Sequence, residues 1–197
     1  MSGNSAAGWV RAELCLGYLS IAQFVEASWW LARYHLGDAK LEDAILRSVQ
    51  TLRGSYESDL VHRCDRFNRD WVQPRIRPGA FAVVETHRKA GDHLCLLTSA
   101  SDYVAAPLAR SLEIEGVICN RFLTDEDGRF TGEAAQPLSF GPGKLALAQA
   151  YAERAGLSLD NAVFYTDSYS DLPVLEAVGG PVVVHPDPRL AQLAARR

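Results

Sequence analysis

The sequence AVFYTDSYSDLP at residues 162–173 decides the fold, because an apolar run ends abruptly in two carboxylates, Asp167 and Asp171. The apolar half is typical of a buried β-strand. Ser170 and Pro173 are typical of a helix start, so the stretch predicts a strand followed directly by a helix. Asp167 then stands at the carboxyl end of a strand, where open parallel sheets bind their ligands. The turn is equally consistent with a simple helix-capping acid, so other parts of the chain must distinguish the two.

The composition is that of an ordinary globular protein, with 48% hydrophobic and 22% charged residues among 197. A net charge of −4 argues against nucleic acid as a partner, but small phosphorylated molecules stay compatible with it. Residues 14–36 form the most apolar early window, and they are too polar for membrane insertion. The four cysteines are scattered, and no secretory signal is visible. We therefore expect reduced thiols and a cytoplasmic location.

Two regions of different pattern meet near PRIRPG at residues 74–79. Residues 6–74 carry apolar stripes at helical spacing and no strand signal, which predicts an all-helical domain. Residues 75–197 alternate helix and strand, which predicts an α/β domain with a parallel sheet covered by helices. In the first region a helix is expected at 55–71. In the second, the expected strands lie at 93–98, 117–119, 162–166 and 181–184, the expected helices at 80–89 (ended by Gly91), 101–112 and 143–155, and a hairpin at 122–132. Asp187 with Pro188 predicts the start of a terminal helix.

Three polar groups fall at the expected strand ends and helix starts. The first is Ser99, which follows a strand, and the second is Lys144, which follows a glycine at a helix start. The third is the pair Asp167 and Asp171. Taken singly, the serine is consistent with a helix cap and the lysine with a solvated surface residue. Together they predict a site for an anion and Mg²⁺, because Mg²⁺ takes one or two carboxylates and phosphate oxygens.

These motifs resemble those of the haloacid dehalogenase superfamily. Leu-Leu-Thr-Ser at 96–99, Lys144 and Thr-Asp-x-x-x-Asp at 166–171 look like its motifs II, III and IV. The segment at 120–132 and Ser-Asp-Leu-Pro-Val-Leu at 170–175 are similar to its phosphoserine-phosphatase-like subgroup. The resemblance implies a Rossmannoid three-layer parallel sheet, with residues 6–74 as an all-helical C1 cap and 75–197 as the core.

The resemblance also implies a Mg²⁺-dependent phosphomonoesterase that acts through an aspartyl-phosphate. Ser99 and the Ala100 N–H would then bind a phosphoryl oxygen, and Lys144 would neutralise the phosphate. Asp167 would coordinate Mg²⁺, and Asp171 would hold Lys144 or a metal-bound water. The partner would be a small phosphomonoester, and the oligomeric state does not follow from the sequence.

One departure from the family pattern concerns the attacking group. The family's nucleophile is the first Asp of Asp-x-Asp-x-Thr at the end of its first strand, and these 197 residues contain no such motif. Their only Asp-x-Asp is at 125–127, in the expected hairpin. We therefore expect an unfilled strand position between the strands at 93–98 and 162–166. Two explanations stand: a start codon assigned too late, or a truncated paralogue that binds without hydrolysing.

The substrate is less constrained than the reaction. A phosphoserine phosphatase would carry a Glu near the start, whereas this chain has Asn4 and Ser5 and no acid before Glu13, which disfavours phosphoserine. Trp9 and the tryptophan pair at 29–30 could contact a hydrophobic substrate such as a lysophosphatidate, although packing within the cap is the favoured interpretation. Histidinol phosphate and other small phosphomonoesters stay open.

Two other classes compete with an active phosphatase. One is a catalytically inactive binding or regulatory protein of the same fold. The other is a response-regulator-like signalling domain, which also gathers acids, a hydroxyl and a lysine around Mg²⁺. The helical region at 6–74 and the hairpin argue against the signalling domain.

Overall fold

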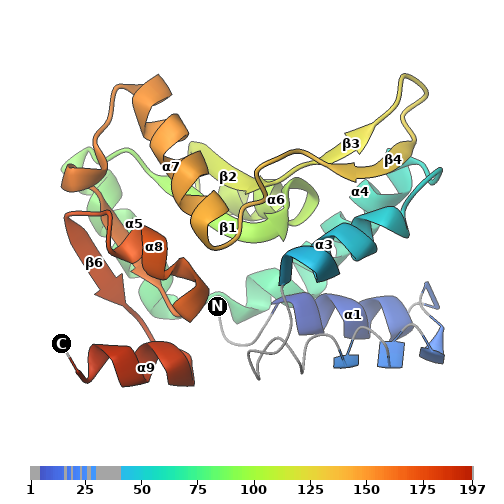
Figure 1. Ribbon diagram of the computed structural model, residues 1–197, viewed down its shortest axis with the longest axis horizontal. Coiled ribbons are helices and arrows are strands. Elements are labelled where there is room, and N and C mark those ends of the chain that lie inside the picture. The colour runs from blue at the N-terminus through green and yellow to red at the C-terminus, as the bar shows by residue number, and fades with distance from the viewer. Residues whose placement is uncertain are drawn as a thin grey trace. The chain divides into compact units, whose positions relative to one another are not determined.

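The computed structural model describes residues 5–15, 17, 18, 20–22, 24, 25, 28, 29 and 41–196, and it divides into two compact units (Figure 1). The first unit takes in the chain up to Leu96 together with Ala100–Ala135, and the second takes in Leu97–Ser99 and Gln136–Arg197. Much of the helical stripe expected between residues 20 and 40 lies outside the described residues. The division into domains at 6–74 and 75–197 stays a prediction.

Helices of the first unit follow the apolar spacing of the sequence. They are α1 (Ser5–Cys15), α3 (Leu41–Gln50), α4 (Glu57–Phe67), α5 (Pro78–Ala90) and α6 (Asp102–Ser111). The strand β2 (Gly116–Asn120) belongs to the same unit, whereas β1 (Cys95–Ser101) has residues in both units. A π-helical turn (Asn68–Val72) and a 3₁₀ turn (Gln73–Arg75) extend α4. Leu60, Cys64 and Phe67 are buried on α4, as a single helical face requires. The helices expected from residues 55–71 and 80–89 are thus confirmed.

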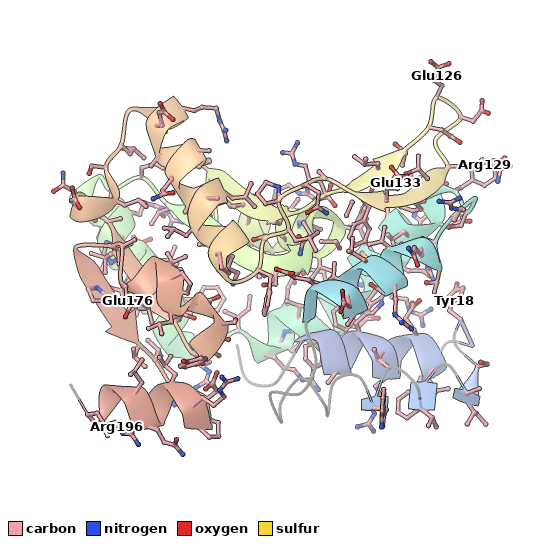
Figure 2. The ribbon with its side chains drawn as sticks, in the orientation of Figure 1. Tyr18, Glu126, Arg129, Glu133, Glu176 and Arg196 are labelled. Carbon is pink, nitrogen blue, oxygen red and sulfur yellow. The ribbon has the colours of Figure 1, made fainter. Side chains whose placement is uncertain are left out.

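The hairpin expected at residues 122–132 is present. Its strands are β3 (Phe122–Thr124) and β4 (Phe130–Ala134), which pair antiparallel. The Asp125 carboxylate shapes the turn, because its Oδ1 accepts the N–H groups of Asp127 and Arg129 at 3.1 and 2.9 Å. Figure 2 shows Glu126 projecting from the end of this hairpin. The lone Asp-x-Asp of the chain is therefore committed to turn formation.

The core of the first unit joins the hairpin to the helices. Phe130 of β4 is buried with Leu60 and Cys64 of α4. The Tyr103 ring of α6 meets Phe130 edge-on at 5.7 Å, and its hydroxyl donates to a Glu57 carboxylate oxygen at 2.7 Å. Burial and edge-to-face packing of these aromatic rings therefore hold α4, α6 and β4 together.

The second unit carries the stretch that ends in the two acids. Its elements are α7 (Pro142–Ala155), a 3₁₀ turn (Leu159–Asn161), β5 (Val163–Thr166), a 3₁₀ turn (Tyr169–Asp171), α8 (Leu172–Leu175), β6 (Gly180–Val183) and α9 (Pro188–Ala194). β5 and β6 run parallel, with Val163 opposite Gly180 and Thr166 opposite Val183. The expected strand, turn and helix at 162–173 are confirmed, although α8 is short and a 3₁₀ turn precedes it.

Within the described residues the strands form three separate pairs, β1–β2, β3–β4 and β5–β6. No described strand bonds β5 on the edge opposite β6. Val163 and Tyr165 of β5 are 46% and 40% exposed, although both residue types favour buried strands. The unfilled strand position expected beside β5 stays a prediction.

Tyr165→Lys is expected to reduce self-association of the 197-residue protein. An exposed apolar edge strand is a template for pairing with another chain, and an edge lysine opposes such pairing. Sedimentation velocity over a range of protein concentrations measures the effect. Val61→Lys is the matched control, since Val61 is 36% exposed on α4 and the substitution adds the same charge on a helix. Equal reductions by both variants would contradict pairing through β5.

The sequence also led us to expect reduced cysteines and no membrane-spanning helix. All four cysteines are free thiols, and burial raises the pKa of the Cys64 thiol to about 12. None of the described helices combines the length with the apolar character that a bilayer crossing needs.

Candidate functional site

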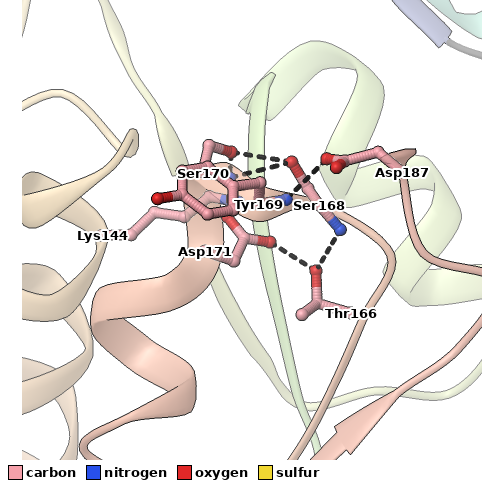
Figure 3. Close-up of polar contacts among 7 residues, drawn as sticks. All are labelled: Lys144, Thr166, Ser168, Tyr169, Ser170, Asp171 and Asp187. Carbon is pink, nitrogen blue, oxygen red and sulfur yellow. Dashed lines mark hydrogen bonds and ion pairs between the residues drawn. The ribbon is translucent and has the colours of Figure 1, made fainter. Parts of the chain in front are cut away.

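A buried ion pair lies at the centre of the site. Lys144, the third residue of α7, places its Nζ 2.6 Å from Oδ1 of Asp171 (Figure 3). The two side chains are only 6% and 7% exposed. A cation in the first turn of a helix is disfavoured by the helix dipole, so the nearby carboxylate offsets an unfavourable position. The lysine that the sequence suggested for a helix start is thus held inside the protein and does not point into solvent.

The second oxygen of Asp171 is also occupied. Thr166, the last residue of β5, donates its hydroxyl to Asp171 Oδ2 at 2.6 Å. The same Thr166 oxygen accepts the Ser168 N–H at 3.1 Å. A buried ion pair is better tolerated when further hydrogen bonds support it, and the Thr166 hydroxyl supplies one to Asp171. Both carboxylate oxygens of Asp171 are therefore engaged by Lys144 and Thr166.

Asp167 differs from Asp171 in its exposure and in the bonding of its carboxylate. It follows β5 directly and is exposed. Within the described part of the chain its carboxylate takes part in no hydrogen bond or ion pair, although its backbone oxygen accepts the Asp187 N–H at 2.7 Å. The turn therefore separates the two acids by role: one is paired inside, and the other faces outward with free oxygens.

A free carboxylate beside hydroxyl groups is a donor set that fits Mg²⁺. The described residues hold no group of three or more His, Cys, Asp or Glu side chains that could enclose a metal ion. Such a cage is not what Mg²⁺ requires, because it commonly takes one or two carboxylates and completes its shell with water and phosphate oxygens. Asp167 is the residue that would hold the ion.

Ser99 and Ala100 lie in a different local structure from the one expected. The sequence placed them between a strand and the first turn of a helix, whereas β1 runs through both and α6 begins only at Asp102. Ser99 belongs to the same compact unit as Lys144, while Ala100 belongs to the other unit. Binding of a phosphoryl oxygen by these two residues stays a prediction.

Two residues of this site make hydrogen bonds that the sequence does not predict. Thr166 was part of the quoted motif, but its hydrogen bond to Asp171 was not foreseen. Asp187 was interpreted only as a helix cap, and it does accept the Leu190 N–H at 2.8 Å at the start of α9. It also accepts the Tyr169 N–H at 2.6 Å (Figure 3). The sequence does not predict the bond between Tyr169 and Asp187, because the two residues lie on separate segments of the chain.

Comparison with known proteins identifies the family of this chain. A family model described as haloacid dehalogenase-like hydrolase matches residues 1–176. A phosphoserine phosphatase named SerB1 from Mycobacterium tuberculosis (strain ATCC 25618 / H37Rv) is 30% identical over 151 residues, covering 77% of this chain and 49% of that protein. A histidinol-phosphatase from Neisseria meningitidis serogroup C (strain 8013) is 33% identical over 134 residues, covering 66% and 60%. The chain thus spans about half the length of the mycobacterial relative.

A solved structure carries the same fold. The crystal structure of a protein of unknown function from Bordetella pertussis Tohama I matches with a TM-score of 0.88 and 29% sequence identity. The match covers 98% of this chain and 89% of that one. The α/β fold expected from the motifs is therefore confirmed.

Proposed function

This chain belongs to the haloacid dehalogenase-like hydrolase family, and we propose that it supplies the metal-binding and phosphate-neutralising half of a Mg²⁺-dependent phosphomonoesterase. The observation that carries the proposal is the buried Lys144–Asp171 pair beside the outward-facing Asp167. Burying a lysine is unfavourable in itself. Here the Asp171 carboxylate binds the Lys144 ammonium group, and the Thr166 hydroxyl binds the same carboxylate. A fixed cation next to a free carboxylate is suited to a dianionic phosphate and its metal ion.

Each side chain has a distinct task in this proposal. Lys144 stabilises negative charge on the phosphate as a preorganised donor, which costs no rearrangement at the moment of reaction. Asp171 and Thr166 fix the direction of the lysine. Asp167 would hold Mg²⁺, which when bound polarises a phosphoryl oxygen and neutralises its charge. Ser99 and the Ala100 N–H would bind a second phosphoryl oxygen.

The attacking carboxylate is proposed to come from outside these 197 residues. They contain no Asp-x-Asp-x-Thr, and the Asp125–Asp127 pair lies in a hairpin turn in which the Asp125 carboxylate binds backbone N–H groups. No described strand bonds β5 on the edge opposite β6, so a further strand could align there. The same absence favours a second candidate function, a catalytically inactive protein that binds a phosphorylated ligand without hydrolysing it.

We propose a small phosphorylated metabolite as the substrate. One relative is named a phosphoserine phosphatase and another a histidinol-phosphatase, so kinship alone does not choose between their substrates. Glu13, the first acid of the chain, is 5% exposed and bonded to Arg63 at 2.6 Å. Burial raises the pKa of Glu13 although Arg63 opposes the rise. This acid is thus committed to the interior, which supports the case against phosphoserine.

The tryptophans give little support to a hydrophobic substrate. The Trp9 ring packs edge-on against Phe67 at 5.2 Å, within the helical region. Trp29 is 52% exposed, and Trp30 lies outside the described residues. The packing of Trp9 favours a structural role for this residue over contact with a lipid such as lysophosphatidate.

The 197-residue protein is expected to show no Mg²⁺-dependent hydrolysis of p-nitrophenyl phosphate. Protein expressed with the in-frame codons upstream of Met1 should hydrolyse it if those codons encode an apolar strand that ends in Asp-x-Asp-x-Thr. Asp167→Asn in that longer protein should abolish turnover, and Asp160→Asn, an exposed acid on a 3₁₀ turn of the same unit, should not. Turnover by the 197-residue protein itself would contradict the proposal. Upstream codons without such a motif would favour the inactive binding protein.

A further inference from the structure

The segment that follows β6 bonds to the turn that carries Asp167. The Val184 N–H donates to the Thr166 carbonyl at 2.9 Å, and the Asp187 N–H donates to the Asp167 carbonyl at 2.7 Å. The two acceptors, Thr166 and Asp167, are adjacent in the chain, whereas the two donors, Val184 and Asp187, are three residues apart. The extra residues include His185, which has a φ of +50°. A non-glycine residue in this left-handed region is uncommon, and such conformations persist only where the surroundings enforce them.

The side chain of Asp187 adds a second connection on the far side of Asp167. Its Oδ2 accepts the Tyr169 N–H at 2.6 Å (Figure 3), and its Oδ1 accepts the Leu190 N–H at 2.8 Å. The Arg189 guanidinium also lies 4.4 Å above the centre of the Tyr169 ring. Asp187 thus joins the acidic turn to the first turn of α9 through one carboxylate, and Arg189 reinforces that connection.

These contacts hold the backbone at Asp167 and at Tyr169, two residues later. Its own carboxylate binds nothing among the described residues, so its direction is set by the backbone that carries it. That backbone is held at the Asp167 carbonyl by the Asp187 N–H, and two residues later at the Tyr169 N–H by the Asp187 carboxylate. The Ser168 N–H between them is held by Thr166 Oγ1 at 3.1 Å.

We propose that Asp187 is a positioning residue that fixes the turn on both sides of Asp167 and thereby sets the affinity of the Asp167 carboxylate for Mg²⁺. This inference rests on the proposed function, in which Asp167 is the metal ligand. A carboxylate is needed at position 187 because two N–H donors have to be accepted at once, one from the acidic turn and one from α9. Residues that orient metal ligands without touching the metal typically change metal affinity by roughly 10- to 100-fold when they are removed.

Asp187→Ser separates the two functions of the side chain. A serine hydroxyl can still cap α9, because serine is a favoured N-cap residue, but it is too short to accept the Tyr169 N–H as well. Leu190→Ala is the matched structural control, since it creates a cavity under the same helix and leaves both Asp187 oxygens in place. Arg189→Met tests the cation–π contact separately.

The experiment is a Mg²⁺ titration of the 197-residue protein followed by backbone amide NMR shifts, together with hydrogen exchange at Tyr169. Asp187→Ser is expected to accelerate exchange of the Tyr169 amide and to raise the Kd for Mg²⁺ about 10-fold or more. Leu190→Ala is expected to lower the melting temperature without raising the Kd.

The outcomes separate the two proposals. The positioning role is overturned if the Kd for Mg²⁺ changes less than about twofold in Asp187→Ser, because removal of an orienting residue should weaken binding much more. It is also overturned if the Tyr169 amide stays protected from exchange in that variant. Asp167→Asn decides the underlying assignment. If it leaves the Kd for Mg²⁺ unchanged, the metal is not bound at Asp167, and both proposals fail together. If it abolishes binding while Asp187→Ser does not weaken it, only the positioning role fails.

Discussion

Replacing Lys144 by methionine is expected to lower the free energy of unfolding by about 3–5 kcal/mol, because it leaves the Asp171 charge buried without its partner. Only 5% of each residue is exposed, so water cannot replace the lost ammonium group. The Thr166 hydroxyl is the strongest bond left to Asp171, and a neutral donor does not balance a buried charge. Urea unfolding followed by circular dichroism measures the loss.

Two further variants distinguish this result from a general effect of removing a lysine. Lys89→Met removes a lysine that is 74% exposed and 3.4 Å from Glu85, and it is expected to leave the unfolding midpoint unchanged. The double variant Lys144→Met with Asp171→Leu is expected to recover most of the loss, because no charge is then buried alone. A Lys144→Met protein as stable as Lys89→Met would show that the pair is not buried in solution.

Gly143→Ala is expected to lower the free energy of unfolding by about 1–3 kcal/mol, the usual cost of forcing extra atoms into a packed region. A Cβ at this position would overlap the carbonyl oxygen of Leu138, so the backbone of one segment must move. Because Gly143 immediately precedes Lys144 in the first turn of α7, the movement also displaces the ion pair. Thermal and urea unfolding measure the loss.

The chain supplies a matched control for this substitution. Gly79 also follows a proline at the start of a helix, in α5, and a Cβ there would meet no atom. Gly79→Ala is therefore expected to be neutral or to stabilise by about 0.4–1 kcal/mol through the unfolded state. Equal tolerance of alanine at both glycines would mean that the first turn of α7 does not pack against Leu138 as described.

Much of the fold could be predicted because its signals are local. The apolar run at 162–166, the cap and proline at 187–188, and the glycine that ends α5 each act within a few residues of themselves. The hairpin was predictable for the same reason, since an acid and a glycine shape its turn. The length of β1 was harder to predict, because its small polar residues at 98–101 continue the strand where helix capping was expected.

One contact of the candidate site could be predicted from the sequence, whereas the hydrogen bonds of Thr166 and Asp187 could not. The sequence brought Lys144 and Asp171 together through their resemblance to family motifs, and the structure places the two groups 2.6 Å apart. The Asp187 carboxylate accepts the N–H groups of Tyr169 and Leu190 because residues 166–171 pack against residues 184–190. The spacing of residues in the sequence does not predict that packing. The roles of Thr166 and Asp187 therefore follow from the tertiary structure alone.

The proposed metal site predicts that the 197-residue protein binds Mg²⁺ through Asp167. Isothermal titration calorimetry should detect Mg²⁺ binding to the unmodified protein and to Asp160→Asn, and none to Asp167→Asn. Asp160 is a suitable control because it is an exposed acid in the same compact unit. Binding that survives in Asp167→Asn, or that disappears equally in both variants, would contradict a metal site at the carboxyl end of β5.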